Sequence, residues 1–332
     1  MIEDSGVPVE LESMATGYVL HQESMDETEA AYAAGAPSGI EGGFKASGLS
    51  YFNLMSVAAG FLRKEKMITS QRKLIDLGDD GVVFEGLFQK SGVCSGCSHS
   101  EADTYGWIAN YAMTGTGPFP QQVSLAWCYL TGRTAYVGRG DTGAVPSLTI
   151  QAIHDIGVLV EADAPELAKL PVTGTNSEED VCIRYRDNPN AFINQYKSRC
   201  GAYRSRVFRP KTPEMISDLV YSGRPVTCGG RYQMRPVRPG SNGISPLYDL
   251  GSGHETAIVG TGLLGGRLFG IKLESWLGAN FYPAGAFPNH RVIVKSDSGI
   301  HALYPSTGAV WLDEWMATNP ECWALDAPSS AT

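Results

Sequence analysis

The chain changes character along its 332 residues, from helix-like spacing in the first half to strand-like runs in the last third. After Cys97, alanine and tyrosine recur three and four residues apart, which predicts one buried face of a helix. Thr212 and Pro213 predict the start of another helix, with Ile216 facing inward and Gly223 beyond its end. We therefore expect an α+β fold with two lobes.

Two further helices are predicted around 54–62 and over 147–156, the second ended by Gly157. The last third instead holds four short apolar or alternating runs, separated by glycine, proline and asparagine. Such runs are typical of antiparallel strands. The four are His254–Gly260, Arg267–Leu273, His290–Lys295 and His301–Tyr304.

The net charge of −9 is unevenly spread. Residues 1–50 hold nine acidic residues and one basic residue, whereas residues 181–240 hold twelve lysines and arginines against three acids. We expect residues 1–80 to form an acidic leader or N-terminal extension that docks on the basic stretch 181–240. The alternatives are an anionic partner for that stretch, or a solvated face with a free tail. Aromatic residues are not interleaved with the bases, so we expect no nucleic-acid partner.

No apolar run approaches the roughly 20 residues of a membrane helix, since the strongest one, Ala257–Leu264, is broken by glycines. No signal peptide is visible either. We expect a protein without a membrane segment, cytoplasmic or assembled into a virion. The seven cysteines are an odd number, so at least one is unpaired within the chain.

The sharpest local feature runs from Gln89 to Glu101 and contains Cys94-x-x-Cys97. A glycine-rich turn is predicted to deliver Cys97 to the start of a helix. The partial positive charge there favours a thiolate, which makes Cys97 a candidate nucleophile. The same spacing also fits a structural disulfide, half a zinc site or a redox pair. A zinc site would need a second close pair, which the sequence lacks, and we expect no metal and no cofactor.

A histidine and a carboxylate follow in the strand-rich part. His254 stands at the start of an apolar strand behind a glycine-rich turn, and the next strand ends in Glu274, Ser275 and Trp276. Two adjacent strands would bring His254 and Glu274 together. A carboxylate accepting the Nδ1–H of the ring would orient it and stabilise its charged form.

These motifs together resemble the papain-like cysteine peptidases, over about residues 85–285. The stretch through Cys94-Ser-Gly-Cys97 is similar to the family's Cys-Gly-Ser-Cys, and Gly253-His254 with the strand to Gly262 is similar to its histidine strand. Glu274-Ser275-Trp276 is similar to its Asn-Ser-Trp. His254 lies 157 residues after Cys97, near the roughly 130–150 of this family.

The resemblance implies a divergent member, of bacterial or phage type. It implies a helical lobe at about 81–205 and an antiparallel, β-barrel-like lobe at about 206–332. It also implies roles: Cys97 as nucleophile, His254 as acid/base, Glu274 as the orienter in place of asparagine, and Gln89 as a donor of the oxyanion hole. Trp276 would shield the His254–Glu274 contact from water.

The expected function is hydrolysis of peptide bonds in a polypeptide substrate. One alternative is a catalytically silent, papain-fold component of a bacterial or viral (virion) assembly. A third possibility is a cell-wall amidase or endopeptidase, since some phage lysin domains use Cys, His and Glu in this order.

Overall fold

The computed structural model describes part of the chain. The described residues are 51–65, 74–76, 82–84, 94–133, 143–168, 181–204, 206–234, 241–275, 292–303 and 307–330. The acidic cluster of the predicted leader, within residues 1–50, lies outside this set, so the docking of the leader stays a prediction. Gln89 and Trp276 also lie outside it, so their predicted roles stay predictions.

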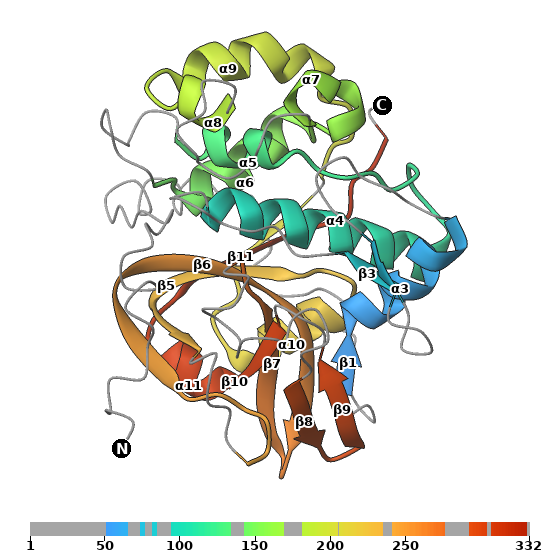
Figure 1. The fold of residues 1–332 in the computed structure, drawn as a ribbon, viewed down its shortest axis with the longest axis vertical. Helices are drawn as coiled ribbons and strands as arrows, with labels where there is room; N and C mark the ends of the chain where they lie inside the picture. The colour runs from blue at the N-terminus through green and yellow to red at the C-terminus, as the bar shows by residue number, and fades with distance from the viewer. Residues whose placement is uncertain are drawn as a thin grey trace.

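The helical lobe gathers short helices on one side of the long helix α4 (Figure 1). Its hydrophobic core is built around Trp127, Leu130, Ile153 and Phe192, all fully buried. The helices are α4 (Cys94–Thr114), α5 (Leu125–Thr131), α6 (Pro146–Ile156), α7 (Pro165–Ala168), α8 (Val181–Arg184) and α9 (Pro189–Tyr196), with 3-10 turns η2 (Glu161–Asp163) and η3 (Lys197–Arg199).

The sheet lobe lies on the other side of α4 (Figure 1) and contains an antiparallel sheet in the order β10-β7-β6-β5-β11-β4, with β1 also paired to β6. Strands β2 and β3, and strands β8 and β9, form two separate two-stranded sheets. The strands are β1 (Tyr51–Asn53), β2 (Leu74–Asp76), β3 (Val82–Phe84), β4 (Val207–Phe208), β5 (Val226–Met234), β6 (Leu247–Leu264), β7 (Arg267–Leu273), β8 (Val292–Ser296), β9 (Gly299–Leu303), β10 (Thr307–Trp311) and β11 (Glu321–Leu325).

Both faces of β6 are buried, each against different helices. Ala257 packs in one cluster with Ala102 and Tyr105 of α4. Its neighbour Ile258 packs in another, with Leu219 of α10 (Pro213–Tyr221) and with Trp315 of α11 (Leu312–Ala317). Because successive side chains of a strand point to opposite faces, α4 covers one face of the sheet, while α10 and α11 cover the other.

The two-lobed α+β architecture predicted from the sequence is confirmed. Among the described strands, however, the sheet is open, because its order runs from β10 to β4 without closing. The capped helix is present as α10: Thr212 Oγ1 accepts from the Met215 N–H at 3.3 Å, and Gly223 takes a left-handed φ of +84°. The predicted helices around 54–62 and 147–156 are present as α3 (Leu54–Glu65) and α6.

Residues 51–65, which fall inside the predicted leader, pack within this fold: β1 pairs with β6, and Leu54 and Met55 of α3 are buried. Where a leader ends therefore stays a prediction. Several arginines of the basic stretch already pair with acids of the lobes. They include Arg199 with Glu166, Arg204 with Asp103, Arg206 and Arg224 with Asp326, and Arg231 with Asp249.

Candidate active site

Strands β6 and β7 bring His254 and Glu274 together. The register places Ala257 opposite Leu273, so Thr256 stands opposite Glu274 and His254 is its diagonal neighbour on the same face. Nε2 of His254 lies 2.5 Å from Oε1 of Glu274, and both side chains are buried.

The Glu274 carboxylate contacts Nε2 of the His254 ring. The prediction from the sequence had been a contact with Nδ1. His254 is two residues away from Thr256, the residue opposite Glu274. Nε2, the ring nitrogen farther from the backbone, is the one that reaches across this distance. Nδ1 then lies on the side of the ring nearer the backbone. A buried carboxylate at one ring nitrogen fixes the orientation of the imidazole.

The N-terminal part of α4 binds β6 at the residue that follows His254. The Ser98 hydroxyl donates to the backbone oxygen of Glu255 at 2.6 Å, and Nε2 of His99 lies 3.0 Å from Oε1 of Glu255. Burial by itself would lower the pKa of His99, but the charge of Glu255, with a smaller contribution from Asp103, raises it above 6.5. The result is a second buried histidine–carboxylate pair, which joins the two lobes.

Cys97 occupies the first turn of α4, which begins at Cys94, one turn earlier than predicted. The Cys97 thiol is fully buried and belongs to the hydrophobic cluster of the helical lobe, whereas His254 and Glu274 belong to the sheet lobe. The hydrogen bond between the lobes is made by the residues that follow these two in the sequence, Ser98 after Cys97 and Glu255 after His254. Both cysteines of the motif thus lie in the first turn of α4, buried beneath the surface.

The packing of α4 explains why a glycine, Gly96, lies between the two cysteines. A Cβ at this position would lie 2.7 Å from Cβ of Tyr129 and 3.2 Å from the backbone oxygen of Leu125, both on α5. Real Cβ atoms do not approach so closely, so α4 packs against α5 only with glycine here. Gly96 therefore has a packing role that the sequence did not reveal.

Lys272 is a further charged residue at this site that sequence reasoning missed. It stands two residues before Glu274 on the same face of β7, is fully buried, and places Nζ 3.4 Å from the ring centroid of Trp315. Burial lowers the pKa of Lys272 to about 7, against the opposing charge of Glu274. The alternation of charged and apolar residues in Lys272-Leu273-Glu274 could have predicted that Lys272 lies on the same face of the strand as Glu274.

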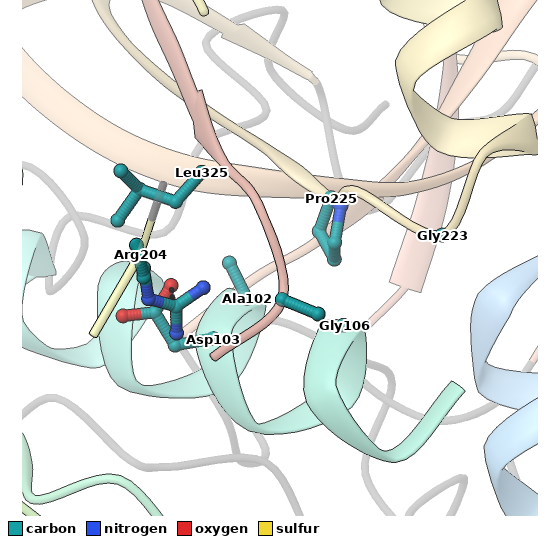
Figure 2. A pocket seen from close by; sticks show the side chains of 8 residues that line it. Ala102, Asp103, Gly106, Arg204, Gly223, Pro225 and Leu325 are labelled. Carbon is teal, nitrogen blue, oxygen red and sulfur yellow. Dashed lines mark ion pairs between the residues drawn. The ribbon is translucent and has the colours of Figure 1, made fainter. Parts of the chain in front are cut away.

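One turn further along α4, the lobes meet at an ion pair beside a small pocket (Figure 2). Asp103 on α4 lies 3.3 Å from Arg204, and both are nearly completely buried. Burial raises the pKa of Asp103, while the charge of Arg204 opposes this. Gly106 and Pro225 close the pocket from the two lobes, with a glycine required because a Cβ would lie 2.5 Å from Pro225.

Within the described residues, no group of three or more histidine, cysteine or acidic side chains is arranged to hold a metal ion. All seven cysteines lie in this part of the chain and are thiols. The helices found there do not include one with the length and apolar character needed to cross a membrane.

No protein-family model and no curated protein matches the chain. Among solved structures it is similar to proCathepsin B S9 from Trypanosoma congolense, at 12% identity, 95% of this chain, 87% of that chain and a TM-score of 0.48. It is also similar to digestive procathepsin L2 proteinase from Tenebrio molitor larval midgut, at 12% identity, 97% of this chain, 80% of that chain and a TM-score of 0.46. A third similar structure is xylellain, a cysteine protease from Xylella fastidiosa, at 15% identity, 95% of this chain, 97% of that chain and a TM-score of 0.42. Such remote likeness leaves the function to be inferred from the site itself.

Proposed function

We propose that the protein is a papain-like cysteine peptidase that hydrolyses peptide bonds in a polypeptide substrate. The observation that carries this proposal is the buried His254–Glu274 pair, on the strand whose next residue, Glu255, is bound by the cysteine-bearing helix α4. A thiolate at a helix N-terminus and an oriented imidazole are the two groups that nucleophilic catalysis by cysteine requires.

In the proposed reaction, Sγ of Cys97 attacks the peptide carbonyl and His254 gives a proton to the leaving amine. Water, deprotonated by His254, then releases the acyl group from the thiol. Glu274 holds the imidazole in place. The backbone N–H of Cys97 and the side chain of Gln89 are proposed to bind the oxyanion. This chemistry needs no metal and no cofactor.

Both reacting side chains are buried, each with 0% exposed surface. A peptide carbonyl would therefore reach Cys97 only after the contacts between α4 and β6 separate, and His254, which faces the inside of the sheet lobe, must turn toward α4 in the same rearrangement. Those contacts include the His99–Glu255 pair, so the proposal links activity to a partial opening of the lobes at this pair.

The test compares two cysteines in one helical turn. The full-length wild type, Cys97→Ala and Cys94→Ala are incubated with an epoxysuccinyl inhibitor and, separately, with an unfolded protein substrate. We expect labelling and cleavage by the wild type and by Cys94→Ala, and neither by Cys97→Ala. Mass spectrometry locates the label.

Equal labelling of the wild type and Cys97→Ala would refute the assignment of the nucleophile. Loss of both readouts in Cys94→Ala alone would transfer the role to Cys94. A folded wild type that neither cleaves nor labels would favour the catalytically silent alternative, and cleavage in a peptidoglycan zymogram alone would favour the amidase.

A further inference from the structure

Two thiols face each other inside the sheet lobe. Cys228 on β5 and Cys322 on β11 are directly opposite in the antiparallel register, and their Sγ atoms lie 2.9 Å apart. Both are buried, at 0% and 1% exposure. Directly opposite residues on antiparallel strands have Cα atoms about 4.5–5.5 Å apart. That separation lies within the range of about 4.4–6.8 Å that a disulfide spans.

We propose that Cys228 and Cys322 form a disulfide that links strand β5 to β11, the last strand along the chain. The two residues are 94 positions apart, and the enclosed segment contains β6 and β7 with His254 and Glu274. The bond would sit close to the candidate site, because Cys228 stands opposite Thr256 and Gly230 opposite His254. This inference does not depend on the peptidase proposal.

The oxidant is a small disulfide such as glutathione disulfide. The thiolate of one cysteine attacks it, forms a mixed disulfide and releases one glutathione thiol. The thiolate of the second cysteine then attacks the protein sulfur of that mixed disulfide and releases the second glutathione. The two cysteines lose their S–H protons and two electrons, one S–S bond forms, and glutathione disulfide is reduced to two thiols.

The surroundings indicate when this exchange takes place. Both sulfurs are buried in the folded lobe, so an oxidant in solution does not reach them there. Burial and the neighbouring thiol also raise the pKa of Cys228, which disfavours the reactive thiolate. The bond therefore forms while the lobe is folding and is afterwards protected from reduction.

The test refolds the full-length chain from guanidinium chloride, either in a mixture of reduced and oxidised glutathione or in dithiothreitol. Free thiols are blocked with N-ethylmaleimide, and peptides are mapped by mass spectrometry. We expect one cross-linked peptide joining Cys228 to Cys322 in the oxidised sample. The thermal midpoint should rise by about 5–10 °C, because the cross-link restricts the unfolded chain.

Cys322→Ala should lack the cross-link and show the same midpoint in both buffers. Cys200→Ala is the matched control, since it removes a partly exposed cysteine, and it should keep the cross-link and the shift. Should Cys322→Ala fail to fold, the wild-type peptide map decides alone. N-ethylmaleimide on both Cys228 and Cys322 in oxidised, natively refolded protein would overturn the proposal, as would a bond from either to another cysteine.

Discussion

His254 and Glu255 are adjacent in β6, and each forms a buried histidine–carboxylate pair on a different face of the strand. His254 points toward the inside of the sheet lobe and meets Glu274, whereas Glu255 points toward α4 and meets His99. One dipeptide thus supplies both the candidate acid/base and an attachment of the lobe that carries the candidate nucleophile.

Removing the partner of His254 should destabilise the sheet lobe. Glu274→Ala leaves the imidazole buried without its carboxylate, and we expect the free energy of unfolding to fall by about 3 kcal/mol. Glu274→Gln keeps an acceptor of similar size and should lose less. Both are measured by urea denaturation at neutral pH.

Asp313→Asn is the control for this comparison. It also weakens an ion pair, with Arg267, but that pair is exposed and should contribute less than about 1 kcal/mol. An equal loss in Asp313→Asn and Glu274→Ala would show that burial of the His254–Glu274 pair has no special effect on stability.

The His99–Glu255 pair should make stability fall as pH rises. The pKa of His99 in the folded protein is above its ordinary value of 6.5, because Glu255 favours the charged ring against the effect of burial. The stabilisation is therefore fully present below pH 6.5 and is lost as pH rises through the folded-state pKa.

The measurement is the difference in unfolding free energy between the wild type and Glu255→Gln from pH 5.5 to 9, in which other titrating groups cancel. We expect this difference to shrink as pH rises. Glu314→Gln, at an exposed position, should show a small difference that does not change over this range. A difference for Glu255→Gln that grows with pH would contradict the assignment.

Lys272 should produce the opposite trend. Its pKa falls from 10.5 to about 7 on folding, chiefly through burial, so the unfolded chain binds more protons between those values. Stability should rise with pH there, by up to about 1.4 kcal/mol per pH unit. Lys272→Met should flatten this rise and be more stable than the wild type at pH 7.

Lys295→Met is the matched control, because Lys295 lies on an exposed position of β8, and its pH profile should follow the wild type. Denaturation midpoints at pH 7, 8, 9 and 10 distinguish the cases. A wild type and Lys272→Met with parallel profiles would mean that Lys272 stays protonated throughout.

Local signals in the sequence predicted the elements well. The cap at Thr212, the stop at Gly157 and the apolar run at Arg267–Leu273 each depend on a few neighbouring residues, and all three are present. The predicted start of α4 was wrong by a turn, because glycine is a poor helix former and Gly96 lies within the first turn, where α4 packs closely against α5.

The pairs inside the site were harder to predict. His254 and Glu274 were placed together because consecutive antiparallel strands pair with one another. The partners of His99 and Cys228 depend on how α4 crosses the sheet and on the return of β11 beside β5, 94 residues later. Neither relationship leaves a periodic signal along the chain.

The packing of the cysteine motif gives the last prediction. Gly96→Ala places a Cβ 2.7 Å from Cβ of Tyr129, so α4 must shift away from α5. We expect a loss of about 1–3 kcal/mol from overpacking, reduced by the better helix propensity of alanine. Denaturant unfolding of the full-length chain measures it. Gly201→Ala is the matched control, because a Cβ there meets no atom within 4 Å and should change stability little. If Gly96→Ala unfolds at the same denaturant concentration as the wild type, α4 and α5 are less closely packed than the structure has them.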